Sequence, residues 1–312
     1  MIRPNEYDEF NKYVATLEGH AGGHPPLKGV ATEVARAALA EQILESKRRI
    51  RYIELLREHG QSDIWISRGS FDPIRGALFT ASMGDIDEAS WLVFLSVHFG
   101  KHRRGGWNLV RDIYFAFGED RRWDWNSTSA NPEAFHWWLV ANKTKFAQKD
   151  TVRQFGNHRK YESLKAESHR GTSKVFASYV SWVGHNRGHS GLIADAMEFA
   201  GSDPAALFDY LYESMSAVTS FGRTAKFDYL TMIGKLGLAP IKPGSPYLNG
   251  STGPLRGARL LVDGDANSRS LAKFLEPIII VLGAALGVGM QEMEDSLCNW
   301  QKSQNKFVAF RG

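Results

Sequence analysis

The sequence is poor in cysteine: one residue, Cys298, in 312. A chain with a single cysteine forms no internal disulfide and no zinc site built from several cysteines. Cys298 lies in the run SLCNW on a helical pattern, so we interpret it as a core residue and not as a nucleophile.

Long apolar runs are also lacking. No stretch approaches the roughly 18 to 20 apolar residues that a membrane-spanning helix needs. The best candidate, residues 277–290, is short and interrupted by glycine, and we expect it to form a buried core helix. Residues 1–10 carry acids and no apolar centre, unlike a secretory signal or transit peptide. We therefore expect no membrane partner and a protein that stays in the cytoplasm.

Segments with the period-two alternation of β-strands are scarce. Helical spacing of apolar residues and helix-start signals are frequent instead, such as Asp85 before an apolar run and proline after Asn131 and Asp203. We predict an all-α fold, with helices over residues 31–59, 85–100, 107–117, 205–219, 268–287 and 291–302 and another that starts at residue 131.

Residues 238–262 are rich in proline and glycine, and we expect a long loop there, which is unusual inside a domain unless it serves a site. A boundary near residues 149–156 would divide the chain into an N-terminal helical half, 1–150, and a C-terminal half, 151–312. One continuous domain is the alternative.

The chain holds 38 basic and 34 acidic residues, a mild excess, but the basic residues gather in three runs. Each run mixes cations with an aromatic residue or glycine, which suits contacts to phosphates and bases. Ordinary solvated charge is the alternative. The runs are KHRRGGW (101–107), FGNHRKYESLK (155–165) and FGRTAK (221–226).

The third run belongs to SFGRTAKFDYL, residues 220–230, which follows one expected helix and begins another. Gly222 would permit a tight turn, and the first N–H groups of the next helix would be free to meet a phosphate. The pattern resembles the hairpin of helix-hairpin-helix DNA glycosylases, although Ser220 replaces the first glycine and the Val-Asp that carries their catalytic aspartate is missing. A plain helix junction is the alternative. The predicted DNA-binding residues are Gly222, Arg223, Thr224 and Lys226.

Longer stretches resemble the alpha-glutamyl/putrescinyl thymine pyrophosphorylase family, the amino acid:DNA transferases of bacteriophages with hypermodified thymine. The similarity runs from about residue 85 onward. It is carried by HFGKH with RGGW (98–107), FGNHRKYESL (155–164), GRTAKFDYLTMIGKLGL (222–238), GPLRGARLL (253–261) and MQEMEDSLCNWQK (290–302).

The resemblance implies a glycosylase-like helical fold, here with extra N-terminal helices. It also implies a reaction in which an amine such as glycine, glutamate or putrescine replaces the pyrophosphate of 5-(pyrophosphoryloxymethyl)uracil in double-stranded DNA. No cofactor is expected, and the site of action would be the cytoplasm of an infected bacterial cell. An enzyme that keeps the glycosidic bond has no need of the glycosylase aspartate.

Such chemistry needs a pocket for a base swung out of the duplex, and cations that stabilise the departing pyrophosphate. Two basic runs are each preceded by Phe-Gly, and we expect them to share one anion site. The predicted pyrophosphate-binding residues are Lys101, His102, Arg103, Arg104, Asn157, His158, Arg159 and Lys160.

The amine must also lose a proton, which requires a general base. His185 and His189 in GHNRGH are four residues apart and would face the same way on a helix. Glu162 and Asp228 are alternative bases. Neither this pair nor His98 with His102 has a third ligand nearby, so we predict no metal site.

Two other functions stay open. A DNA glycosylase acting on a modified or damaged base would need a nucleophile, for which Asp228, Lys226 and Asp263 are the candidates. A non-catalytic DNA-binding module would explain the basic runs but not the histidine-rich segments. The sequence does not name the amine.

Overall fold

The computed structural model describes residues 2–23, 25–59, 62–156 and 162–309. In these residues it has fifteen α-helices, several short 3₁₀ helices and no strand, so the predicted all-α fold is confirmed. Two isolated β-bridges, His102 with Gly106 and Ser163 with Gly171, are the β pairings found in the described part of the chain.

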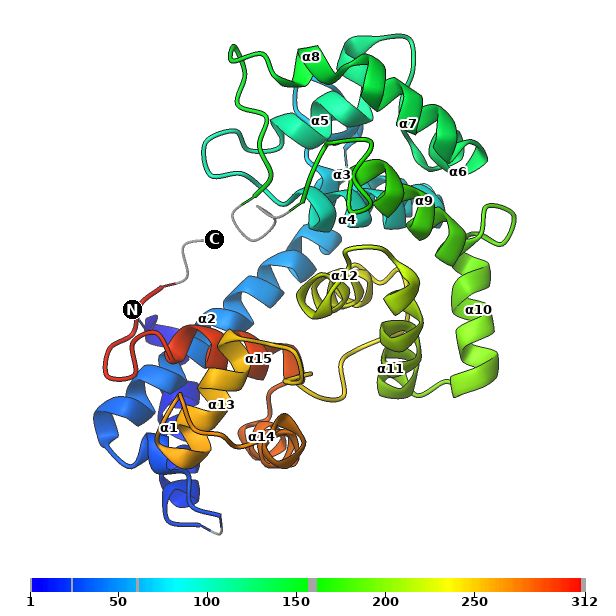
Figure 1. The fold of residues 1–312 in the computed structure, drawn as a ribbon. Helices are drawn as coiled ribbons and strands as arrows, with labels where there is room; N and C mark the ends of the chain where they lie inside the picture. Colours follow the sequence, from blue (N-terminus) through cyan, green and yellow to red (C-terminus); the bar gives the residue numbers. More distant parts are fainter. Residues whose placement is uncertain (1, 24, 60–61, 157–161, 310–312) are drawn as a thin grey trace. The chain divides into compact units, whose positions relative to one another are not determined.

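The chain forms two compact units. Unit 1 comprises Met1–Ile53 and Pro243–Gly312, and thus both ends of the chain, coloured blue and yellow to red in Figure 1. Unit 2 comprises Glu54–Lys242. The position near residues 149–156, where the sequence suggested a boundary, lies inside unit 2.

Unit 1 has a core of mostly aliphatic side chains on five helices, with Tyr13 and Trp300 also buried in it. The helix expected over residues 31–59 is confirmed as α2, which buries Leu39, Ile43 and Leu44 at helical spacing. The last two expected helices are confirmed as α14 and α15. The helices of this unit are α1 (Tyr7–Ala21), the start of α2 (Glu33–Glu58), α13 (Gly253–Asp263), α14 (Ala272–Leu286) and α15 (Met290–Trp300).

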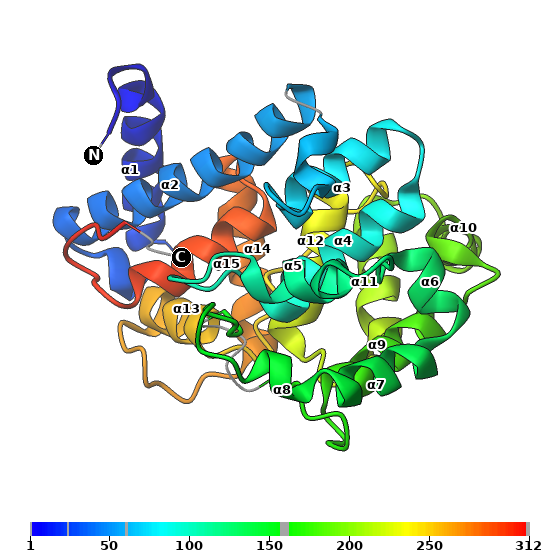
Figure 2. The same cartoon turned by 90° about the horizontal axis from the view of Figure 1, so that it is seen from above.

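The expectation of a loop over all of residues 238–262 is wrong, because α13 begins at Gly253 with proline in its first turn. Glycine in this segment serves close helix packing. A Cβ atom on Gly257 would lie 2.3 Å from the carbonyl oxygen of Leu297 in α15. The two helices lie side by side in both views (Figure 1 and Figure 2).

The expectation that residues 277–290 form a buried core helix holds for one face of α14. Leu275, Ile279 and Leu282 are buried, whereas Phe274 and Val281 are each 63% exposed. By length and composition no single helix of the described residues qualifies as a membrane span, although α14 and α15, bent by 109°, meet that criterion together.

Unit 2 is organised around α4, whose side chains from Glu88 to Phe99 are all buried. The predicted start and end are confirmed: the Asp85 carboxylate accepts the Glu88 N–H at 2.9 Å, and Gly100 ends the helix with a φ of 65°. The Phe94 ring stacks on Tyr179 of α9 with centroids 3.7 Å apart.

Helices α3, α5, α6, α10 and α12 of unit 2 pack against α4. Asn131 and Asp203 cap α7 and α11 as the sequence predicts, but α11 ends at Ser214 and a 3₁₀ turn, Met215–Ala217, follows it. The helices that lie wholly in unit 2 are α3 (Pro73–Ser82), α4 (Ile86–Phe99), α5 (Asn108–Tyr114), α6 (Trp125–Ala130), α7 (Pro132–Ala141), α8 (Lys143–Phe146), α9 (Thr172–Val183), α10 (Gly188–Ala200), α11 (Pro204–Ser214) and α12 (Arg223–Lys235).

Candidate functional site

The first basic run forms a tight turn between α4 and α5. The His102 N–H donates to the Gly106 oxygen at 3.0 Å, and the Gly106 N–H donates back to His102 at 2.8 Å. The Nδ1 atom of His102 accepts the Gly105 N–H at 3.0 Å, so this ring nitrogen holds the turn together. Lys101, Arg103 and Arg104 are exposed.

The start of the second basic run lies against this turn. The Gly156 N–H donates to the Phe99 oxygen at 2.8 Å, and the Phe155 ring stacks on Phe99 at 5.4 Å between centroids. A Cβ atom on Gly156 would lie 2.9 Å from the carbonyl carbon of Gly100, so glycine allows the two segments to touch.

Four of the predicted pyrophosphate-binding residues, Asn157, His158, Arg159 and Lys160, lie outside the described residues. The structure does bring together the two Phe-Gly pairs, Phe99-Gly100 and Phe155-Gly156, that precede the basic runs. Convergence of the cations themselves on one anion site stays a prediction.

The two histidines proposed as bases occupy different environments. His185 lies in an exposed turn before α10, with Nδ1 2.8 Å from the Ser129 hydroxyl. His189 lies in the first turn of α10 and is 2% exposed. Residues 185–187 form a turn and α10 begins at Gly188, so the two histidines do not lie on one continuous helix.

His189 belongs to a buried hydrogen-bonded network that joins four helices. Its backbone N–H and its Nδ1 atom lie 2.6 and 2.7 Å from Oδ1 of Asp87 on α4. Its Nε2 atom lies 2.7 Å from the hydroxyl of Tyr179 on α9. The Tyr179 hydroxyl lies 2.9 Å from that of Tyr229 on α12.

The electrostatics fix the direction of these bonds. Burial lowers the pKa of His189, and the hydrogen bond from His189 lowers the pKa of Asp87, so a neutral ring donates from Nδ1 to a carboxylate. Burial raises the pKa of Tyr179 and of Tyr229, which keep their protons. Nε2 then accepts from Tyr179, whose oxygen accepts from Tyr229.

Both ring nitrogens of His189 are thus engaged inside the protein. A base for an incoming amine needs a lone pair that the amine can reach, and the lone pair of Nε2 is occupied by Tyr179. The side chain of Asp87, 38% exposed, is the member of the network nearest to solvent.

Sequence reasoning missed Asp87, which reads as one of several acids at a helix start and lies 102 residues from His189. Gly188, directly before His189, is the sequence feature that could have indicated this contact. Its φ is 65°, and a Cβ atom there would lie 2.8 Å from the Asp87 carboxylate, so the approach of Asp87 to α10 requires glycine.

The turn before α12 differs from its predicted form. Gly222 has an ordinary φ of −73° and open space around it, whereas Ser220 carries the left-handed φ of 62°. Ser220 therefore makes the tight turn. Gly222 is exposed as the N-cap residue, with no side chain to shield the helix start.

The basic residues of α12 separate in the structure. The Lys226 ammonium is turned inward, where it donates to the Ser216 hydroxyl at 2.9 Å and lies 4.0 Å from the Tyr212 ring centroid, and burial lowers its pKa. Lys226 is thus removed from the surface that would meet DNA, while Thr224 stays exposed and Arg223 partly so.

The two alternative bases lie apart in the chain. Asp228 is exposed on α12, and Glu162 is partly buried in the segment that leads to α9. No group of three or more His, Cys, Asp or Glu residues suited to a metal ion occurs in the described residues.

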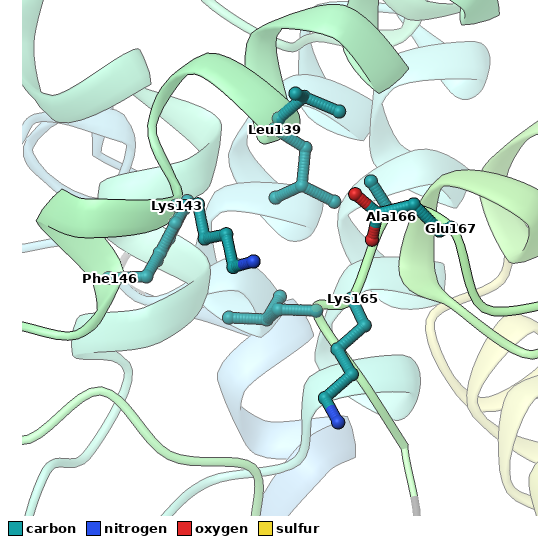
Figure 3. A pocket seen from close by; sticks show the side chains of 8 residues that line it. Leu139, Lys143, Phe146, Lys165, Ala166 and Glu167 are labelled. Atoms are coloured by element: carbon teal, nitrogen blue, oxygen red, sulfur yellow. The ribbon is translucent and has the colours of Figure 1, made fainter.

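A cavity of about 150 Å³ that the sequence did not predict lies between the end of α7, α8 and residues 164–167 (Figure 3). Its walls are mostly apolar, and three charged residues border it. The lining residues are Leu139, Val140, Lys143, Phe146, Leu164, Lys165, Ala166 and Glu167.

These features define an all-α protein with a partly exposed helix start and an exposed basic turn suited to phosphate groups. A family model, alpha-glutamyl/putrescinyl thymine pyrophosphorylase clade 3, matches residues 34–312, and the chain belongs to this family. The predicted family is confirmed. The family name indicates a thymine-modifying enzyme of pyrophosphate chemistry and implies DNA with a modified thymine as substrate. Searches of curated proteins and of solved structures gave no match.

Proposed function

We propose that this protein replaces the pyrophosphate of 5-(pyrophosphoryloxymethyl)uracil in double-stranded DNA with an amine. The family match over residues 34–312 carries the proposal. In the reaction, the amine nitrogen forms a bond to the methylene carbon on the base. The carbon–oxygen bond breaks, pyrophosphate leaves with the electron pair, and the nitrogen loses a proton.

The leaving group gains negative charge as the bond breaks, and fixed cations lower the barrier by stabilising that charge. Lys101, Arg103 and Arg104 supply such cations on a turn that the His102 ring holds in shape. Arginine suits this task because its planar guanidinium binds two phosphate oxygens at once. The contact between Gly156 and Phe99 supports a shared site with residues 157–160.

His185 is the proposed base, since it is exposed and its Nδ1 is oriented by Ser129. Asp228 and Glu162 remain alternatives. The start of α12, with exposed Gly222 and Thr224 beside Arg223, is the proposed contact to DNA phosphates, a role that does not require the base sequence to be read.

The test is mass spectrometry of nucleosides from DNA that carries the pyrophosphorylated base, after incubation with the protein and a panel of amines. We expect an amine-bearing nucleoside and free pyrophosphate. Release of a free base would identify a glycosylase instead, and unchanged DNA would indicate a binding module.

A further inference from the structure

The cavity beside α8 has the form of a small-molecule site. Leu139, Phe146 and Leu164 contribute apolar walls from three different segments of the chain. A water molecule takes about 30 Å³ of liquid volume. A cavity of about 150 Å³ therefore holds a molecule of a few heavy atoms, and a nucleotide is too large for it.

Two opposite charges face this space. In Figure 3 the Lys143 ammonium and the Glu167 carboxylate point into the cavity from opposite sides, while the Lys165 ammonium points away. In the described part of the chain neither Lys143 nor Glu167 forms an ion pair, and both side chains are exposed. The two charged groups are therefore available to a ligand.

A ligand with one positive and one negative end matches this arrangement. The carboxylate of a free α-amino acid would meet Lys143, its ammonium group would meet Glu167, and a small side chain would contact the apolar walls. A diamine such as putrescine would place a like charge against Lys143, and a dicarboxylate without an amine would place one against Glu167.

We propose that this cavity binds a free α-amino acid, which serves as the amine donor, and that Lys143 and Glu167 select it over a diamine. The proposal rests on the proposed function for the donor role, because a transferase must bind its amine co-substrate. Binding of the amino acid to the cavity does not require DNA.

Isothermal titration calorimetry of the full chain without DNA tests the site, with glycine, glutamate, putrescine and acetate as ligands. We expect an amino acid to bind at least tenfold more tightly than putrescine or acetate. Lys143→Met and Glu167→Gln should each weaken that binding about tenfold or more. Lys145→Met is the matched control on the same helix, because Lys145 pairs with Glu119 and does not line the cavity. It should leave the affinity unchanged.

Putrescine binding as tightly as any amino acid, or equal affinities in Lys143→Met and Lys145→Met, would overturn the assignment. The nucleoside assay separates this outcome from failure of the proposed function. Transfer of putrescine in preference to amino acids refutes the cavity proposal alone. Amino acid binding that depends on Lys143, without transfer of any amine to DNA, refutes the proposed function and the donor role and leaves the binding site itself in place.

Discussion

Glu88 allows a direct test of how burial controls charge in unit 2. Its side chain is buried on α4, where the Trp125 N–H donates to Oε2 at 2.7 Å and the Tyr114 hydroxyl lies 2.8 Å from Oε1. Burial raises the pKa of Glu88 from an ordinary 4.5 to about 8. At neutral pH the folded protein therefore holds this carboxyl group mostly protonated.

The sign of the pH dependence follows from linkage. Because the folded pKa is the higher one, the contribution of Glu88 to stability is fully present below pH 4.5 and is lost as the pH rises to about 8. Each pKa unit corresponds to about 1.4 kcal/mol. Raising the pKa of Glu88 from 4.5 to about 8 therefore changes the free energy of unfolding by as much as about 5 kcal/mol over this pH range.

Glu88→Gln should remove this dependence. The glutamine amide imitates the protonated acid, since its oxygen accepts from Trp125 and its NH₂ group donates to the Tyr114 hydroxyl. We expect the free energy of unfolding of the variant to match that of the wild type near pH 5. Near pH 8.5 the variant should be the more stable by up to about 4 kcal/mol.

Urea denaturation followed by tryptophan fluorescence, at several pH values between 5 and 8.5, measures this difference. Glu198→Gln on the exposed face of α10 is the matched control and should parallel the wild type. Parallel stability curves for Glu88→Gln and the wild type, or a less stable variant at pH 8.5, would refute the reasoning.

Four other outcomes are expected. Gly188→Ala should lower the free energy of unfolding by about 1 to 3 kcal/mol more than Gly201→Ala, because both glycines have positive φ but, of the two, Gly188 faces a carboxylate. Equal losses of stability for the two variants in urea denaturation would contradict this. Gly222→Val should keep the fold, since its Cβ meets open space, and should weaken DNA binding alike for every sequence in fluorescence anisotropy. Arg103→Ala should raise the reaction barrier by about 2 to 4 kcal/mol, a rate loss of roughly 30- to 1,000-fold, and change DNA affinity much less; a fully active variant would remove Arg103 from the anion site. His185→Gln should slow the transfer without changing DNA affinity, because glutamine cannot take the proton of the amine; an unchanged rate would move the role of base to Asp228 or Glu162.

The sequence alone determined the fold class, the family and some of the helix boundaries. Helix starts such as Asp85 and Asn131 are readable because a cap bonds N–H groups two or three residues away, and the signal is therefore local. The left-handed conformation of Ser220 was not predicted, because the conformation of a turn depends on the segments packed against it.

Tertiary structure decided which side chains meet. Asp87 and His189 are 102 residues apart, and the packing of α4 against α10 brings them into contact. Burial of Lys226 and the placement of Lys143 and Glu167 at one cavity likewise depend on segments that contact one another only in the folded chain. The spacing of apolar residues along the sequence shows where a helix forms. The burial of a side chain and the charges around it depend on residues distant in sequence. For that reason the network and the cavity became visible only in the structure.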